Sequence, residues 1–225
     1  MSKQVMSKKG NIIISIFLTI VSVIYTLLVK YVDVKAIGPN NSKVGFSSLN
    51  DAFRNLVNSN MGIYKITELL GYIIILIVLV YGALGLIELI KNKSIKKVDR
   101  ELIILGCFYG LVLITYVLFE KVIINYRPIL IDNELEASYP SSHTILSLCI
   151  GISSIIVSKK YLNKKYLKIT NTLTIVLMSL VLVGRMISGV HWISDIIGGI
   201  IVSCTLLMYF KTAYYWNRKK ISSQK

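Results

Sequence analysis

The segment 184–195, GRMISGVHWISD, places three groups that can do chemistry between two strongly apolar runs. His191 and Asp195 are four residues apart, so on a helix they share a face and the carboxylate can reach the imidazole. A carboxylate on one ring nitrogen fixes the tautomer and makes the other nitrogen a better nucleophile or base. Arg185 adds a planar guanidinium, which suits a phosphate group. The spacing therefore predicts nucleophilic chemistry on a phosphate.

Two further polar segments carry matching groups, EKVIINYRP at 120–128 and SYPSSH at 138–143. Arg127 in the first would neutralise charge on the phosphate oxygens during phosphoryl transfer. Ser141 and Ser142 supply hydroxyl and backbone N–H groups at a predicted helix start, where an anion is favoured. His143 is the only other histidine of the chain, and it is suited to protonating a departing oxygen.

The elements that must position these groups are apolar helices. The chain has 225 residues, of which 54% are hydrophobic. Its mean hydropathy of +0.66 is too apolar for a soluble fold. Trp192 and Trp216 flank the last apolar stretch and are expected to lie in the two membrane interfaces. We predict an all-α, polytopic protein with one membrane domain over 1–225 and six antiparallel transmembrane helices. The stretches lie near 11–31, 67–90, 101–120, 143–159, 167–186 and 193–213.

The net charge of +15 is distributed unevenly. If the N-terminus is cytoplasmic, the inner segments 1–10, 88–101, 159–168 and 211–225 hold 18 of the 26 basic residues but three of the 11 acidic ones. This positive-inside pattern predicts cytoplasmic N- and C-termini and an extracytoplasmic position for the polar segments. It also favours contact with anionic lipid over nucleic-acid binding.

The long outer loop, 33–66, contains an amphipathic stretch, SLNDAFRNLVN. Leu49, Phe53 and Leu56 share one helical face, whereas Asn50 and Arg54 lie on the other. We expect a short interfacial helix here, which either caps the bundle or gates the access of lipid to an outer site.

The polar segments resemble the signatures of the type 2 phosphatidic acid phosphatase (PAP2) superfamily, which are K-x6-R-P, P-S-G-H and S-R-x5-H-x3-D. The third is complete from its arginine onward in RMISGVHWISD, with Gly184 in place of the leading serine. The second reads PSSH, with Ser142 in place of glycine. The resemblance covers about residues 67–213.

The first signature departs further from the pattern. Arg127 and Pro128 are present, but Lys121 precedes the arginine by six positions, and Glu120 holds the seventh. One position corresponds to a rotation of about 100° on a helix. Lys121 is therefore a phosphate ligand only if the helix unwinds or bulges locally.

The resemblance implies a role for each matched residue. His191 attacks phosphorus and forms a phosphohistidine, and Asp195 orients it. His143 protonates the leaving group and then activates water. No metal or other cofactor is needed, and the chain offers no carboxylate-rich metal site. The implied substrate-binding residues are Arg127, Arg185, Ser141, Ser142 and, where the helix unwinds, Lys121.

Together these observations predict a bacterial membrane lipid phosphatase, with a lipid substrate in the bilayer and no nucleic-acid partner. The candidate substrates are undecaprenyl diphosphate, phosphatidylglycerophosphate and phosphatidate. One alternative is a lipid phosphotransferase that uses the same site. A second is a non-catalytic transporter or lipid-binding relative, and a third is a serine hydrolase that uses Ser141 or Ser142. The oligomeric state stays open.

Overall fold

The computed structural model describes residues 8–216, so the predicted cytoplasmic termini at 1–7 and 217–225 lie outside the described residues. The described chain is helical, with isolated bridges in place of regular strands. This confirms the all-α prediction. Its helices are α1 (Lys8–Tyr31), α2 (Ser47–Arg54), α3 (Met61–Asn92), α4 (Arg100–Lys121), α5 (Ser142–Tyr161), α6 (Lys164–Ile187) and α7 (Ile193–Tyr215).

Within residues 8–216, six helices are long and apolar enough to cross a membrane, as predicted. The main difference lies at the start of α3, which begins at Met61 rather than near residue 67. The side chain of Asn60 accepts a hydrogen bond from the Ile63 N–H and caps the helix there. The first turns of α3 carry polar side chains. The apolar run used to predict the helix therefore begins after its true start.

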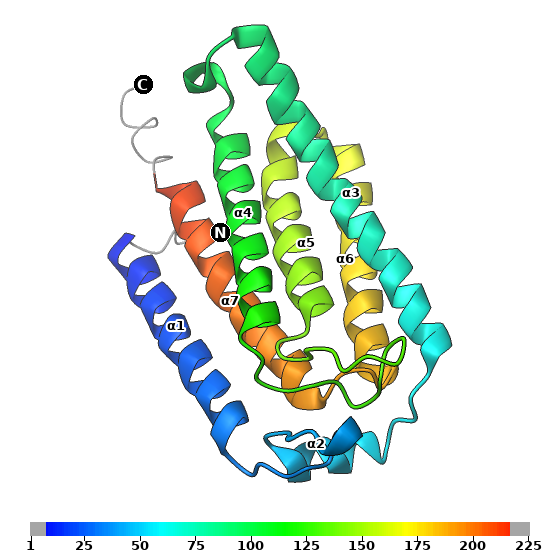
Figure 1. Ribbon diagram of the computed structural model, residues 1–225. Coiled ribbons are helices and arrows are strands. Elements are labelled where there is room, and N and C mark those ends of the chain that lie inside the picture. Colours follow the sequence, from blue (N-terminus) through cyan, green and yellow to red (C-terminus); the bar gives the residue numbers. More distant parts are fainter. Residues whose placement is uncertain (1–7, 217–225) are drawn as a thin grey trace.

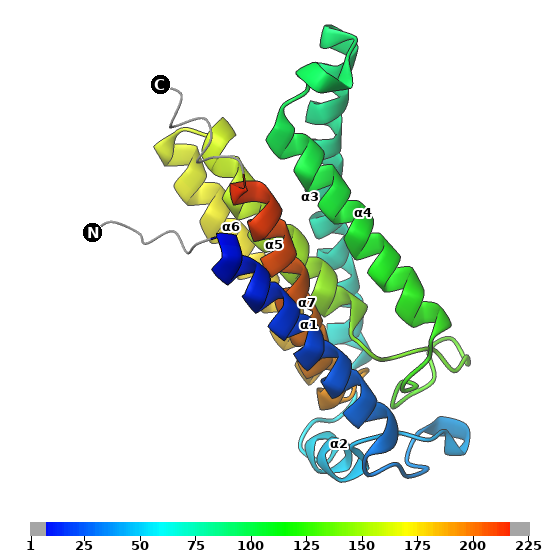
Figure 2. The same cartoon turned by 90° about the vertical axis from the view of Figure 1, so that its left-hand side faces the viewer.

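The helices form a bundle in which α5 contacts α3, α4, α6 and α7, and α1 packs along α7 (Figure 1). The short helix α2 lies across one end of the bundle, which we call the α2 end (Figure 1). Figure 2 shows α3 and α4 leaning away from the other long helices toward the opposite end. Buried positions make up 61% of the most apolar window in α5 and in α7, compared with 6% in α3. Helices α5 and α7 are therefore the centre of the fold.

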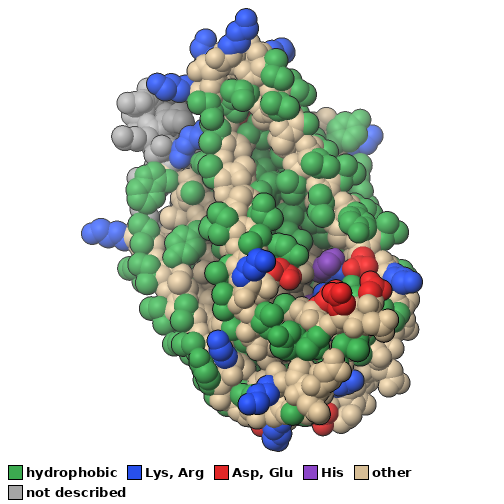
Figure 3. Space-filling view, in the orientation of Figure 1, with side chains coloured by type: hydrophobic (Ala, Val, Ile, Leu, Met, Phe, Trp, Pro, Cys, Tyr) green, Lys and Arg blue, Asp and Glu red, His purple; other side chains and the backbone are tan. Residues whose placement is uncertain are grey.

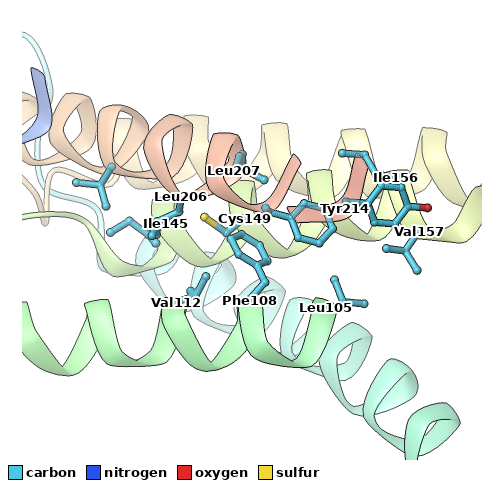
Figure 4. Close-up of a cluster of buried hydrophobic side chains, with 12 residues drawn as sticks. Leu105, Phe108, Val112, Ile145, Cys149, Ile156, Val157, Leu206, Leu207 and Tyr214 are labelled. Atoms are coloured by element: carbon cyan, nitrogen blue, oxygen red, sulfur yellow. The ribbon is translucent and has the colours of Figure 1, made fainter. Parts of the chain in front are cut away.

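Two of the apolar clusters in the described chain join α5 to its neighbouring helices. The larger one joins α4, α5 and α7, and Figure 4 shows its side chains meeting between these helices. Phe108 and Phe210 pack within it with their ring centroids 4.8 Å apart. The smaller cluster joins α3, α5 and α6 through Ile74, Ile150 and Val181. Since each cluster includes α5, this helix connects the two sides of the bundle.

Small and hydroxylated residues let α5 occupy the centre. The hydroxyls of Ser147 and Ser154 donate to carbonyls of their own helix, so their burial leaves no donor unsatisfied. A Cβ added to Gly151 would clash with Met178 Sδ on α6, so α5 and α6 approach more closely than a larger residue allows.

Hydrogen bonds also fasten α1 to the rest of the bundle. Ser22 pairs with Thr205 of α7 at 2.8 Å, and Thr26 pairs with the Tyr139 hydroxyl at 2.8 Å. These hydroxyl pairs bridge segments that are far apart in the sequence. Such contacts position α1 within an apolar environment, where few other polar partners exist.

Helix α2 differs from the prediction in length and in orientation. It ends at Arg54, and Asn50, expected on the outward polar face, is buried. The Asn50 amide donates to the Gly45 carbonyl and to Ser194 Oγ, and its oxygen accepts from the Ser194 N–H. Leu56, by contrast, is 82% exposed. Asn50 faces inward because it satisfies backbone groups at the start of α7, which the amphipathic pattern could not indicate.

Candidate active site

The polar segments identified in the sequence meet at the α2 end of the bundle. This region combines the loop 122–141, the last turn of α6, the α6–α7 connection and the first turns of α3, α5 and α7. Histidine and acidic side chains gather near this end in the space-filling view, whereas hydrophobic side chains cover much of the surface above them (Figure 3). The convergence joins residues that lie up to about 130 positions apart in the sequence.

His191 and Asp195 are both buried and lie within ion-pair distance of each other, but no direct hydrogen bond joins them. His191 Nδ1 lies 3.9 Å from Asp195 Oδ2. Ser138 lies between them, donating to Asp195 Oδ2 at 2.5 Å and standing 3.0 Å from His191 Nδ1. The two residues do not share a helical face, because His191 precedes the start of α7 at Ile193. The two residues are linked by the loop that carries Ser138, rather than by one face of a helix.

Asp195 is held by the beginning of α7. The Trp192 N–H donates to Asp195 Oδ2 at 3.0 Å, which is the hydrogen bond of an N-terminal capping box. Asn125 Nδ2 donates to the other carboxylate oxygen at 3.4 Å. Trp192 was expected in the membrane interface, yet it is 2% exposed, and its indole N–H donates to the Tyr126 carbonyl. Trp192 is buried because its indole ties α7 to the loop 122–141.

Arg185 lies in the last turn of α6 and is fully buried. Its guanidinium stands over the ring of Tyr64, with Cζ 4.7 Å from the ring centroid. None of its three guanidinium nitrogens has a hydrogen-bond acceptor within residues 8–216. Gly184 permits this packing, because a Cβ there would clash with Thr67 Cγ2 of α3. A serine at position 184 would therefore have to displace the Thr67 side chain from the α3–α6 contact.

Arg127 approaches the same aromatic ring from the loop 122–141. Its Cζ lies 5.8 Å from the Tyr64 ring centroid, and its Nε lies 3.0 Å from Glu136 Oε2. Tyr64 therefore stands beside two guanidinium groups. Sequence reasoning missed both Tyr64 and Glu136, since neither belongs to a spacing pattern. Only the polar character of the first turns of α3 hinted at Tyr64.

The two serines of the PSSH segment have different surroundings. Ser141 is fully buried, its N–H donates to the Asp195 carbonyl, and its hydroxyl accepts from Thr144. Ser141 therefore fastens α5 to α7. Ser142 lines two cavities, one shared with His143 and the other with His191. Ser142 is thus the serine that faces the site, and neither serine is hydrogen-bonded to a histidine among the described residues.

The residues of the altered first signature lie at the end of α4. Glu120 lines the narrow cavity that also contains His191 and Ser138. Lys121 is the last residue of α4 and is exposed. The acidic residue, rather than the lysine, therefore lines the cavity that contains the nucleophile candidate.

A cavity of about 610 Å³ extends from His143 between α3, α4 and α5. Glu68 and His143 lie at its polar end, and most of its remaining lining is apolar. His143 also packs against α3, since a Cβ added to Gly71 would stand 3.1 Å from His143 Nε2. The cavity thus connects the polar site with the apolar interior of the bundle.

The electrostatic environment favours a neutral His191. Burial, followed by the positive charges of Arg127 and Arg185, holds the pKa of the His191 imidazole well below its usual range. A neutral imidazole keeps a lone pair on one nitrogen, and His191 Nε2 has no hydrogen-bond partner in the described part of the chain. No cluster of three or more metal-ligating side chains occurs within residues 8–216. The arrangement suits attack by His191 Nε2 on an electrophile held by the two guanidiniums.

Comparisons with known proteins place the chain in a family and relate its fold to a solved structure. Residues 73–219 match the sequence model of the PAP2 superfamily. The chain is 28% identical over 189 residues to the bacitracin transport permease protein BcrC of Bacillus licheniformis, covering 80% of this chain and 85% of that protein. Its fold is similar to the crystal structure of a transmembrane PAP2-type phosphatidylglycerolphosphate phosphatase from Bacillus subtilis. That match has a TM-score of 0.57 and 17% identity, and it covers 88% of this chain and 94% of the other.

Proposed function

Because this chain belongs to the PAP2 superfamily, we propose that it is a multi-pass membrane lipid phosphatase that forms a phosphohistidine at His191. The main support for this proposal is Arg185. Its guanidinium is fully buried, and its nitrogens have no hydrogen-bond acceptor among residues 8–216. A buried guanidinium without a hydrogen-bond acceptor is costly, so such a site is suited to an anion. Arg127, on the same aromatic ring, supplies the second positive charge.

We infer the reaction from the chemistry of the polar groups gathered at the site. His191 Nε2 attacks phosphorus, forming an N–P bond as the bond from phosphorus to the leaving oxygen breaks. His143 donates a proton to that oxygen. Water then attacks the phosphohistidine while His143 takes its proton, releasing inorganic phosphate and restoring His191. Arg127, Arg185 and Ser142 bind the phosphoryl oxygens throughout.

The cavity supports a substrate with an apolar tail. Its polar end contains His143, and its apolar lining runs between α3, α4 and α5. A phosphate at the two guanidiniums would therefore leave the tail beside the helices, within the bilayer. Undecaprenyl diphosphate, phosphatidylglycerophosphate and phosphatidate all have this form. The relative from Bacillus subtilis is described as a phosphatidylglycerolphosphate phosphatase, which supports the same substrate class.

The charge distribution supports an extracytoplasmic site. Basic residues dominate the α3–α4 and α5–α6 connections, at the end of the bundle opposite the candidate site. The positive-inside rule assigns that end to the cytoplasm. The α2 end, with His143 and His191, then faces outward.

A transporter is the second candidate, because the relative from Bacillus licheniformis is described as a transport permease. Transporters typically hold polar binding groups near mid-membrane. In the described helices, the charged residues lie toward the helix ends, and the site is at one of those ends. This distribution favours chemistry at the membrane surface. A phosphotransferase with the same site would require an acceptor for phosphate to leave His191.

The deciding experiment is phosphate release by the purified protein in detergent and EDTA. The three lipids are compared as substrates, with His191→Ala as the inactive variant and Ser203→Ala as the matched control, since Ser203 is buried in α7 and bonded within its helix. Release that persists in EDTA, remains in Ser203→Ala and disappears in His191→Ala supports the proposal. Release only after addition of an acceptor would identify a phosphotransferase. A folded wild type that releases nothing under either condition would contradict both.

A further inference from the structure

Ser138 occupies a position that no signature of the site includes. It is 2% exposed and lies between the two residues expected to contact each other directly. We propose that Ser138 is a positioning residue, a hydroxyl relay that carries the hydrogen-bonded link from Asp195 to His191 and sets the imidazole tautomer. This inference rests on the proposed function, in which His191 is the nucleophile.

The count of hydrogens at Ser138 determines the tautomer. A hydroxyl has one proton, and Ser138 donates it to Asp195 Oδ2 at 2.5 Å. Toward His191 Nδ1, at 3.0 Å, the same oxygen can then only accept. Nδ1 must therefore carry a hydrogen, and in the neutral ring Nε2 must carry the lone pair. The nitrogen without a protein partner is thus the nucleophilic one.

Asp195 has the contacts of an ionised acceptor, as this direction of donation requires. The Trp192 N–H shares Asp195 Oδ2 with the serine, and Asn125 Nδ2 approaches Oδ1. The Ser194 hydroxyl donates to Oδ1 at 3.5 Å, so four donors surround one buried group, which fits a carboxylate that only accepts. A direct bond to His191 is absent at 3.9 Å, so the serine supplies the link within the described site.

The loop holds Ser138 in place from both sides. The Ser138 N–H donates to the Asn125 carbonyl at 2.9 Å, and Asn125 itself contacts Asp195. The next residue, Tyr139, packs against α7, because a Cβ added to Gly198 would clash with its ring. The backbone that carries the Ser138 hydroxyl is therefore fixed beside the histidine.

Ser138 is not itself suited to be the nucleophile. In a Ser–His–Asp triad the histidine lies between the serine and the carboxylate and takes the serine proton. Here the serine lies between the other two, and its proton is directed at Asp195. During attack, Nε2 forms the N–P bond and the ring gains positive charge, which the Nδ1–H shares with the serine oxygen and the carboxylate. No proton needs to leave the imidazole in this step.

The first test reads the tautomer without using activity. The chain has two histidines, so His143→Gln labelled with ¹⁵N-histidine contains a single imidazole. Nitrogen NMR at neutral pH should show a protonated Nδ1 and an unprotonated Nε2 in the Ser138 protein. Adding Ser138→Ala should give a mixture of tautomers. A protonated Nε2 in the first protein, or identical spectra in the two, would overturn the relay.

The second test separates positioning from substrate binding. Ser138→Ala should lower kcat by about 10²-fold, the scale expected when a reacting group is misplaced, with KM little changed. Ser138→Thr, which keeps a hydroxyl, should recover most of the rate, and Ser203→Ala should match wild type. Equal rates in Ser138→Ala and Ser203→Ala would contradict the relay. If wild type releases no phosphate, the proposed function fails, and the tautomer still decides whether the relay exists.

Discussion

The two sides of the bundle use glycine in opposite ways. On the side formed by α5, α6 and α7, glycines are covered: Gly151 faces Met178, and Gly198 faces the ring of Tyr139. Four glycines on α3 and α4 are uncovered: a Cβ added to any of them would have no atom of the described chain within 4 Å. These four residues, Gly82, Gly85, Gly106 and Gly110, line cavities of about 610 and 360 Å³.

The packed side positions the polar residues of the site, whereas the open side provides space for a substrate to enter. The closely packed side carries Asp195 and Arg185, and its contacts leave little room for these groups to move. The open side borders His143 and provides apolar space for a lipid tail. A phosphatase that works on membrane lipids needs both properties. Here they are assigned to different helices.

The largest loss of activity is expected when a basic residue of the site is removed, with an exposed basic residue as the comparison. Arg127→Ala should lower kcat/KM by about 10³-fold, because it removes a buried guanidinium that would stabilise the phosphoryl oxygens. Lys121→Ala, at the exposed end of α4, should change it much less. Equal losses in phosphate-release assays would show that Lys121 reaches the site after all.

Gly198→Ala tests the closely packed side, and Gly85→Ala is its matched control. The added Cβ at residue 198 would displace the Tyr139 ring and with it Ser138, so we expect up to about 10²-fold loss of kcat. Overpacking should also lower the free energy of unfolding by about 1–3 kcal/mol. Gly85→Ala should leave kcat and the thermal unfolding midpoint unchanged or slightly raise the latter. Similar behaviour of both variants would remove the distinction between the two sides.

Gly110→Leu tests the open side by filling its larger cavity. We expect KM for a long-tailed lipid phosphate to rise about tenfold, the scale that one methylene group contributes in an apolar pocket. A short, water-soluble phosphate ester provides the comparison, and its kcat/KM should stay constant. An equal decrease in kcat/KM for both substrates would mean that the variant disturbs His143 rather than the space for the lipid tail.

The smallest effect is expected in the hydroxyl pairs of α1. Ser22→Ala removes the hydrogen bond to Thr205 and should lower the free energy of unfolding by about 0.6 kcal/mol. Reversible unfolding in mixed micelles would measure this change, with kcat as a second reading. A lower kcat at unchanged stability would show that α1 has a direct part in the reaction.

The fold was largely predictable because lipid imposes simple rules. Six apolar stretches predicted six helices, and the structure confirms them. The start of α3 and the orientation of α2 were not predicted. Asn60 and Asn50 are polar residues whose side chains satisfy backbone groups, and hydrophobic periodicity carries no information about such contacts.

The site was predictable only in part. His143, Arg127 and Arg185 were singled out by residue type and spacing, and the structure brings them to the same end of the bundle as His191. Tyr64 and Ser138 belong to no pattern, because their importance arises from what they touch. A direct hydrogen bond between His191 and Asp195 was predicted from their four-residue spacing on a helix. His191 lies before the start of α7, so that spacing does not apply.

The helical class, the polar residues that gather at one end of the bundle and the family signatures can all be read from the sequence. Those properties depend on local composition and spacing, which lipid makes decisive. Three features depend on the packing of the folded chain: Ser138 stands between His191 and Asp195, Trp192 is buried, and Glu120 lines the cavity that contains His191. Each of these depends on how the loop 122–141 packs against the starts of α5 and α7, and such packing has no periodicity along the chain.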